Sequence, residues 1–269
     1  SIIGYFLLKG LTCSFIYIII QFRRCHENCQ ETTKKGRISM SLSKIPRILF
    51  EDQEILVCHK PSGVPAQTNR IGTPDLVSIL KNHLRKESRS PYLALIHRLD
   101  QPVEGLMVFA KTPRSAKELS RQLTTSGFGK YYLAVAVGVP SEAEADLTDY
   151  LVKDARSNTS HICSKDTPQA KIAKLHYKVL AAGTTADGSS CSLLKIHLDT
   201  GRHHQIRVQM AHMGHPLIGD RKYNLTGTSS PKLLLCSFRL SFRHPVTGKK
   251  MEFILPVPEE YPLSSGKVL

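Results

Sequence analysis

One carboxylate stands where a reactive group is expected. Asp100 follows Arg98 in the segment HRLDQPVEGLMVFAKT, residues 97–112, and precedes the apolar run at 106–110. An apolar run of this length is typical of a buried strand. Functional side chains are often carried by the loops that such rigid elements position. The segment therefore predicts a nucleophilic or proton-abstracting carboxylate at Asp100.

Several common chemistries lack the motifs that they need. The chain contains no G-x-x-x-x-G-K-[ST] loop, and in the segment after Gly127 a tyrosine, Tyr132, stands where a dinucleotide turn requires its third glycine. H-E-x-x-H and G-x-S-x-G are also absent. We therefore expect no ATP, NAD or other cofactor, and neither zinc proteolysis nor esterase activity. Aspartate, arginine, tyrosine and histidine remain as the candidate functional groups.

The charge of the chain predicts a polyanionic partner. The 269 residues carry a net charge of +15, and 41% of them are apolar, which is enough for a sizeable core. Clustered basic side chains attract and hold phosphates. RNA or DNA is therefore the leading partner and an anionic membrane surface the second. The basic excess persists when residues 1–39 are left out.

Cysteine and histidine usage favours a reducing compartment without a bound metal. The seven cysteines are an odd, scattered set, which is typical of a cytoplasmic protein rather than a disulfide framework. Two groups have spacings that resemble metal sites, but the first has no second pair of ligands near it, and we expect neither to bind a metal ion. They are Cys25, His26 and Cys29 in one segment, and His203, His204, His212 and His215 in another.

Residues 1–39 differ from the rest of the chain. An apolar run at 2–22 is followed by a basic polar stretch at 23–37. We expect this segment to be a non-domain extension, either translated upstream sequence before Met40 or a membrane anchor, with a targeting segment as the third interpretation. Residues 40–269 then form one catalytic domain.

The elements that must position Asp100 alternate between strands and helices. A strand at 55–59 ends in the turn at 60–63. Thr73 is the expected cap of a helix whose apolar face contains Leu76, Ile79, Leu80 and Leu84. Thr112 and Pro113 begin a second helix that ends before Gly127, and a third helix spans 205–213.

The remaining apolar runs predict a largely antiparallel sheet. Strands are expected at 106–110, 131–137, 174–180, 191–197, 235–242 and 251–255. Strands in this order, with few helices between them, indicate an α+β fold. We expect a mostly antiparallel mixed sheet as its core, with flanking helices.

Three separated segments resemble the RluA-type pseudouridine synthases. They are HRLDQPVEGLMVFAKT at 97–112, KYYLAVAVG at 130–138 and TGRHHQIRVQMAHMGHPLIGDRKYN at 200–224. KPSG at 60–63 and Leu235 followed by His244-Pro245 agree with the same family. The resemblance covers about 47–258, and three motifs in the right order are more specific than any one of them. It implies the pseudouridine synthase catalytic fold.

The resemblance implies that the protein isomerises a uridine within RNA to pseudouridine, its C-glycoside. The base is detached, rotated and rejoined to the same ribose through carbon, so no cofactor is consumed. Asp100 matches the essential aspartate of the family, and Arg207 matches the arginine that pairs with it. We expect a bidentate contact between these two side chains. Asp100 then either attacks C6 of the uracil or acts at the ribose.

Other positions are implied to contact the base or the RNA. Tyr132 matches the tyrosine of the K-x-Y motif, whose ring can stack on a uracil flipped out of the RNA. Leu235 resembles the apolar wall opposite, and Arg98 is a candidate for holding the nucleotide out. The other candidate RNA contacts are Lys60, Arg202 and His204.

The chain departs from the common pattern of the family at three positions. Val103 and Glu104 replace a Thr-Ser pair, and Gln209 stands at a frequent histidine. Because Glu104 adds a negative charge near the expected cleft, it puts the choice of RNA in doubt rather than the chemistry.

Two other functions compete with the synthase interpretation. A non-catalytic RNA-binding protein could retain the fold, but it would not need Asp100, Tyr132 and Arg207 together. A metal-dependent nuclease would require more clustered carboxylates. We expect a monomer that acts on structured ribosomal or transfer RNA, without a membrane unless residues 1–39 are an anchor.

Overall fold

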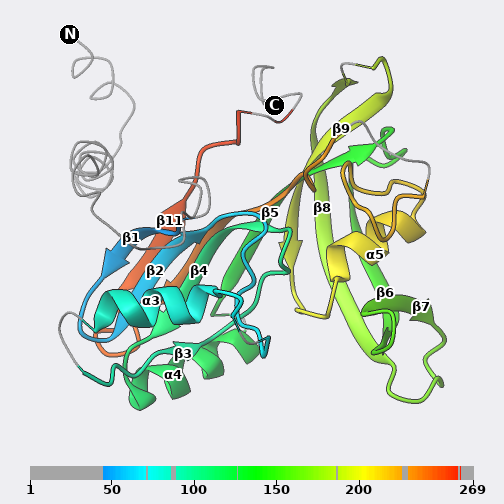
Figure 1. Cartoon of the computed structure of the whole chain (residues 1–269). Helices are drawn as coiled ribbons and strands as arrows, with labels where there is room; N and C mark the ends of the chain where they lie inside the picture. Colours follow the sequence, from blue (N-terminus) through cyan, green and yellow to red (C-terminus); the bar gives the residue numbers. More distant parts are fainter. Residues whose placement is uncertain are drawn as a thin grey trace, which may run out of the picture. The chain divides into compact units, whose positions relative to one another are not determined.

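The computed structural model describes residues 45–259 and 261, except 71, 86–88, 126, 186 and 226–229. Within these residues the chain forms one large sheet flanked by three helices (Figure 1). In chain order the elements are β1 Arg47–Glu51, β2 Ile55–Lys60, α3 Leu76–Leu84, β3 Ala94–Leu95, β4 Glu104–Ala110, α4 Pro113–Thr124, β5 Gly129–Val137, β6 Glu144–Asp154, β7 Thr159–Cys163, β8 Lys171–Thr184, β9 Ser190–Leu198, α5 Gln205–His212, β10 Leu235–Arg243 and β11 Lys250–Ile254.

The sheet confirms the expected mixed, mostly antiparallel architecture. Its strands lie in the order β1-β2-β4-β10-β5-β9-β8-β6-β7, with β11 paired to β10 and β3 paired to β4. Among the described strands, only β4 and β10 pair in parallel. This parallel contact brings the chain after Asp100 beside a strand that begins more than 130 residues later.

Two large buried clusters lie on the sheet, and the described residues form a small third one of Leu151, Ala173 and Val208. One large cluster contains Leu76 of α3 and Met210 of α5, and the other contains Leu119 of α4. Side chains alternate between the two faces of β4, so this strand contributes to both clusters: Met107 faces the first and Leu106 the second. In Figure 1, α3 and α4 lie beside the half of the sheet that contains β2 and β4, whereas α5 lies beside β6 and β8.

The helix signals are confirmed in part. Thr112 caps α4 by accepting a hydrogen bond from the Ser115 amide, with Pro113 in the first turn, as expected. The predicted cap at Thr73 is wrong. Asp75 is the cap of α3, because its carboxylate and the Ser78 hydroxyl form a reciprocal capping box. A cap at Thr73 could not form this pair of hydrogen bonds.

The expected strands are present, with ends that differ by up to a few residues. The strands β1, β3, β6 and β7 were not predicted. β6 alternates between exposed and half-buried residues with little apolar contrast, so its sequence has only a weak strand signal. It forms because β8 pairs with it along eight residue positions, from Glu144 opposite Lys178 to Leu151 opposite Lys171.

The assignments made for residues 1–39, including the Cys25, His26 and Cys29 group, lie outside the described residues. Within the described part of the chain, no helix has the length and apolar character that crossing a membrane requires.

Gly105 makes the parallel contact of β4 with β10 possible. Its φ is +124°, and a Cβ there would lie 2.5 Å from the Ser237 amide nitrogen and 2.8 Å from its carbonyl carbon. Gly105→Ala should therefore lower the free energy of unfolding by on the order of 3 kcal/mol. Gly188→Ala is the matched control, because Gly188 also has a positive φ but open space around it. Equal losses in urea denaturation would contradict a steric role for Gly105.

Candidate active site

Asp100 lies in a turn that neighbouring backbone holds in place. The Val103 amide donates to the Asp100 carbonyl oxygen at 3.0 Å, which closes the turn before β4. The Gly63 amide donates to the Gln101 carbonyl oxygen at 2.8 Å, and the Ser62 hydroxyl donates to the Pro102 carbonyl oxygen at 2.7 Å. The turn after β2 therefore anchors the Asp100 loop, while the Asp100 side chain stays 27% exposed.

Lys60 belongs to this anchor rather than to an RNA surface. Its side chain is fully buried, and its ammonium donates to the carbonyl oxygens of Val64 at 2.7 Å, Pro61 at 3.1 Å and Gln101 at 3.1 Å. Burial lowers the pKa of Lys60 to about 8, although the charge of Asp100 opposes the shift. All three donors are used within the fold, which argues against the predicted contact with RNA.

Arg207 lies beside Asp100 but forms its bidentate pair with another residue. Its Nη1 is 3.3 Å from Asp100 Oδ2, whereas its Nε and Nη2 donate to Asp220 Oδ2 at 2.7 Å and Oδ1 at 2.8 Å. The side chains of Arg207 and Asp220 are 4% and 0% exposed. The predicted bidentate contact with Asp100 is therefore wrong. Asp220 binds Nε and Nη2 of the guanidinium, and Nη1 reaches Asp100.

The charges of this pair are stabilised by each other. Burial lowers the pKa of Arg207, but the hydrogen bonds and charge of Asp220 outweigh that effect and raise it. Burial likewise raises the pKa of Asp220, and Arg207 more than compensates. Asp220 also accepts from the amides of Lys222 and Tyr223. Asp220 falls within the third family segment, but nothing in the sequence predicted that it binds the arginine.

His204 reaches Asp100 from the other side. Its Nε2 is 3.5 Å from Asp100 Oδ2, and its Nδ1 is 2.7 Å from the Tyr223 hydroxyl. Burial lowers the pKa of His204 to about 4, so the imidazole is neutral near pH 7. The Ser160 amide donates to the Tyr223 hydroxyl at 2.8 Å, which leaves that hydroxyl free to donate to Nδ1. The ring proton then lies on Nε2, facing Asp100. His204 thus contacts the carboxylate, and its predicted contact with RNA has no support in this placement.

The other predicted residues divide into buried and exposed groups. Tyr132 and Leu235 are 5% and 3% exposed. Both belong to the buried cluster that also contains Leu76 of α3 and Met210 of α5. Burial, with the nearby charge of Asp100, raises the pKa of Tyr132, so the site contains its phenol form. Arg98 is exposed. Arg202 is half-buried and donates from Nε to the Ile172 carbonyl oxygen at 2.8 Å.

Two of the three departures from the family pattern, Glu104 and Gln209, are balanced within the fold. Glu104 is 8% exposed, and one carboxylate oxygen lies 3.0 Å from the Lys232 ammonium. Its charge is therefore offset rather than presented to a ligand. Gln209 is buried and donates to Asp149 Oδ2 at 2.8 Å. The four neighbouring histidines form no group that could hold a metal ion within the described residues.

Two buried neutral histidines predict a loss of stability in mild acid. Burial lowers the pKa of His97 to about 3 and that of His204 to about 4, below the ordinary value of 6.5. Below pH 6.5 the unfolded chain binds protons at these rings that the folded chain does not, so stability falls as the pH falls. Each ring should contribute a loss of about 2 kcal/mol between pH 7 and pH 5.

Urea denaturation at several pH values measures this effect. The amide of Val108 donates to His97 Nε2, so His97→Gln keeps an acceptor while removing the titrating group. This variant should show a smaller loss between pH 7 and pH 5 than the parent protein. An unchanged pH dependence would show that His97 titrates alike in both states.

The comparisons with known proteins agree on one family. Residues 54–212 match the RNA pseudouridylate synthase family. Ribosomal large subunit pseudouridine synthase D of Nitrosomonas europaea is 31% identical over 229 residues, which cover 80% of this chain and 62% of that protein. The protein of the same name from Vibrio parahaemolyticus is 31% identical over 79% of this chain and 67% of its own length.

A solved structure supports the same fold. Human RNA pseudouridylate synthase domain containing 1 superimposes with a TM-score of 0.66 at 22% identity, covering 81% of this chain and 86% of that one. The chain spans 62% of the length of the first relative above. The family match covers more than half of the chain and includes the segment with Asp100 and the helix with Arg207. The chain therefore belongs to the RNA pseudouridylate synthase family, among its RluA-type members.

Proposed function

We propose that this protein converts uridine to pseudouridine in RNA, with Asp100 as the catalytic residue. The observation that carries the proposal is the surrounding of Asp100: a partly exposed carboxylate faces a buried guanidinium on one side and a neutral imidazole on the other. Burial and, after it, the charge of Asp100 raise the pKa of Tyr132. A reactive carboxylate held between fixed donors is suited to covalent or proton-transfer chemistry.

The reaction is balanced without a cofactor. The bond from C1′ of the ribose to N1 of the uracil breaks, the base rotates, and a bond from C1′ to C5 forms. N1 gains a proton and C5 loses one. Asp100 either adds to C6 of the uracil or removes a ribose proton to allow a glycal intermediate, and we favour the second route. Either route needs the ionised carboxylate.

The neighbours of Asp100 have separable tasks in this proposal. Arg207 supplies positive charge at one carboxylate oxygen, and Asp220 prevents the guanidinium from turning away. His204 and Tyr223 orient an N–H toward the same oxygen. In the proposal, Tyr132 stacks on the flipped base, Leu235 forms the apolar wall opposite, and the exposed Arg98 contacts the RNA. Because a flipped base must leave its stack, a target in a loop costs less than one in a helix.

Ribosomal RNA is the first substrate to test, because the relatives compared above are named for the large ribosomal subunit. Unmodified ribosomal and transfer RNA transcripts would be incubated with the purified protein and mapped by carbodiimide labelling with reverse transcription. We expect new pseudouridine in ribosomal RNA. Modification of transfer RNA alone would correct the substrate. RNA binding without modification of either would support a non-catalytic RNA-binding protein instead.

A further inference from the structure

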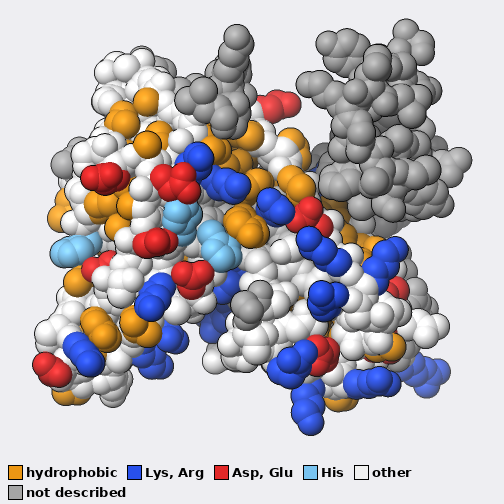
Figure 2. All heavy atoms as spheres, turned by 180° about the vertical axis from the view of Figure 1, so that it is seen from behind, with side chains coloured by type: hydrophobic (Ala, Val, Ile, Leu, Met, Phe, Trp, Pro, Cys, Tyr) orange, Lys and Arg blue, Asp and Glu red, His pale blue; other side chains and the backbone are white. Residues whose placement is uncertain are grey.

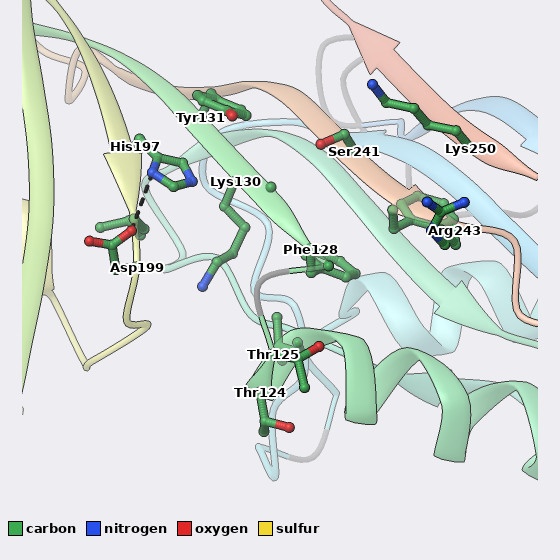
Figure 3. Close-up of a pocket in the computed structure, with 15 residues that line it drawn as sticks. Thr124, Thr125, Phe128, Lys130, Tyr131, His197, Asp199, Ser241, Arg243 and Lys250 are labelled. Atoms are coloured by element: carbon green, nitrogen blue, oxygen red, sulfur yellow. Dashed lines mark ion pairs between the residues drawn. The ribbon is translucent and has the colours of Figure 1, made fainter. Parts of the chain in front are cut away.

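A groove of about 620 Å³ opens where the end of α4 meets the first residues of β5 and the ends of β9 and β10 (Figure 3). Lys130 enters the groove from β5, and Arg243 and Lys250 come from β10 and β11 on the other side. A groove of this size can hold a ligand as large as a short stretch of nucleic-acid backbone. The proposed chemistry at Asp100 uses none of these three side chains.

Lys130 is the most informative residue of the groove. It is only 7% exposed, and within the described part of the chain no carboxylate lies within ion-pair distance of its ammonium and no hydrogen bond is formed. Burial lowers its pKa, while the charge of Asp199 partly opposes the shift. The ammonium nitrogen is accessible from the groove and has no partner among the described residues. An anion that enters the groove would pair with it.

The groove as a whole has a surplus of positive charge. Arg243 and Lys250 are exposed and, among the described residues, have no carboxylate partner. The lining contains one carboxylate, Asp199, which is paired with His197 at 3.3 Å. On the face drawn in Figure 2, basic and acidic side chains both occur across the surface. Unpaired cations that converge on a groove therefore distinguish this site better than net charge does.

The groove is suited to phosphates rather than to bases. Among its aromatic residues, Phe128 and Phe242 are buried and stacked on each other at 5.7 Å. Tyr131 is already engaged by the His197 ring at 4.7 Å and the Arg239 guanidinium at 4.8 Å. Base stacking on Tyr131 would displace these contacts. The hydroxyls of Thr124 and Thr125 at the rim already donate to the carbonyl oxygens of Arg121 and Gln122, so contacts to phosphate oxygens would come from the lysine and arginine side chains of the groove. Such contacts hold a strand without reading its sequence.

We propose that this groove binds the phosphodiester backbone of the RNA strand beside the target nucleotide. Lys130 stands two residues before Tyr132 on β5, about 7 Å along the strand, and its charge interacts with that of Arg202. A strand with its target base at Asp100 could thus continue into the groove. This inference rests on the proposed function only in taking RNA as the ligand.

The test compares RNA binding by variants of the full chain across salt concentration. Lys130→Met removes the buried charge while keeping a long apolar stem, and Lys250→Glu reverses a charge at the rim. Lys130→Met should weaken binding about three- to fivefold and make the slope of log affinity against log salt shallower by about 0.7–0.9. Lys250→Glu should weaken binding further. Lys117→Glu is the matched control, since Lys117 is an exposed lysine of α4 that does not line the groove.

Each outcome decides the proposal. If the slope of log affinity against log salt were the same for Lys250→Glu and Lys117→Glu, the proposal would be overturned, even if Lys130→Met failed to fold. Stabilisation of the parent protein by millimolar inorganic phosphate, with no change in the RNA salt slopes of the variants, would show a free-phosphate site and overturn the RNA assignment. If the parent protein binds RNA but forms no pseudouridine, the proposed function fails, whereas the salt slopes still report on the groove.

Discussion

Replacing Asp100 with asparagine should reduce pseudouridine formation by about 10³-fold or more, because the carboxylate is the only group that both proposed routes require. The amide has nearly the same size, so Arg207 and His204 keep their places. RNA binding should therefore change little. The measurement is single-turnover formation of pseudouridine in a saturating amount of enzyme, with RNA affinity determined in parallel.

Asp166→Asn is the control for this variant, because Asp166 is exposed in the turn between β7 and β8. It should retain full activity. If the Asp100→Asn variant formed pseudouridine as fast as the parent protein, Asp100 would not be the catalytic residue. Loss of activity together with loss of RNA binding would show a binding role instead.

Replacing Asp220 with alanine should have the largest effect on stability. Asp220 is the bidentate partner of Arg207, and both side chains are almost fully buried. Removing one member leaves a buried guanidinium whose remaining carboxylate neighbour is Asp100 at 3.3 Å. We expect the free energy of unfolding to fall by about 3–5 kcal/mol. The amides of Lys222 and Tyr223 also lose their acceptor.

Urea denaturation measures this loss, and Glu118→Ala is its control. Glu118 pairs with Arg121 on the exposed side of α4, so breaking that pair should leave the unfolding midpoint nearly unchanged. If Asp220→Ala and Glu118→Ala lost equally little free energy of unfolding, the buried pair of Arg207 and Asp220 would not stabilise the fold. We also expect Asp220→Ala to slow catalysis, because Arg207 is then free to turn toward Asp100 or away from it.

The sequence predicted the α+β class and the principal strands correctly because these depend on local periodicity. Apolar residues at 106–110 specify a buried strand whatever their partners, and Thr112 followed by Pro113 specifies a helix start. The signals failed where two local alternatives competed. Thr73 and Asp75 are both acceptable caps, and only the reciprocal bonds with Ser78 favoured the second.

The strands β6 and β7 show a different limit of sequence patterns. Their residues have little apolar contrast, and they become strands because β6 pairs with β8 on one side and with β7 on the other. The pairing supplies hydrogen bonds that no periodicity within β6 encodes. Strand propensity depends strongly on such neighbours.

The sequence by itself predicted which residues are candidates for the reaction. Asp100, Tyr132 and Arg207 were identified from motifs, and the structure brings Asp100 and Arg207 together across 107 residues of chain. Only the tertiary structure decided their partners: Asp220 as the bidentate partner of Arg207, His204 beside Asp100, and Lys60 as a buried anchor of the Asp100 loop. The reason is physical. The sequence specifies the type of each side chain. Its burial and its hydrogen-bond partners depend on segments that come together only when the sheet has formed.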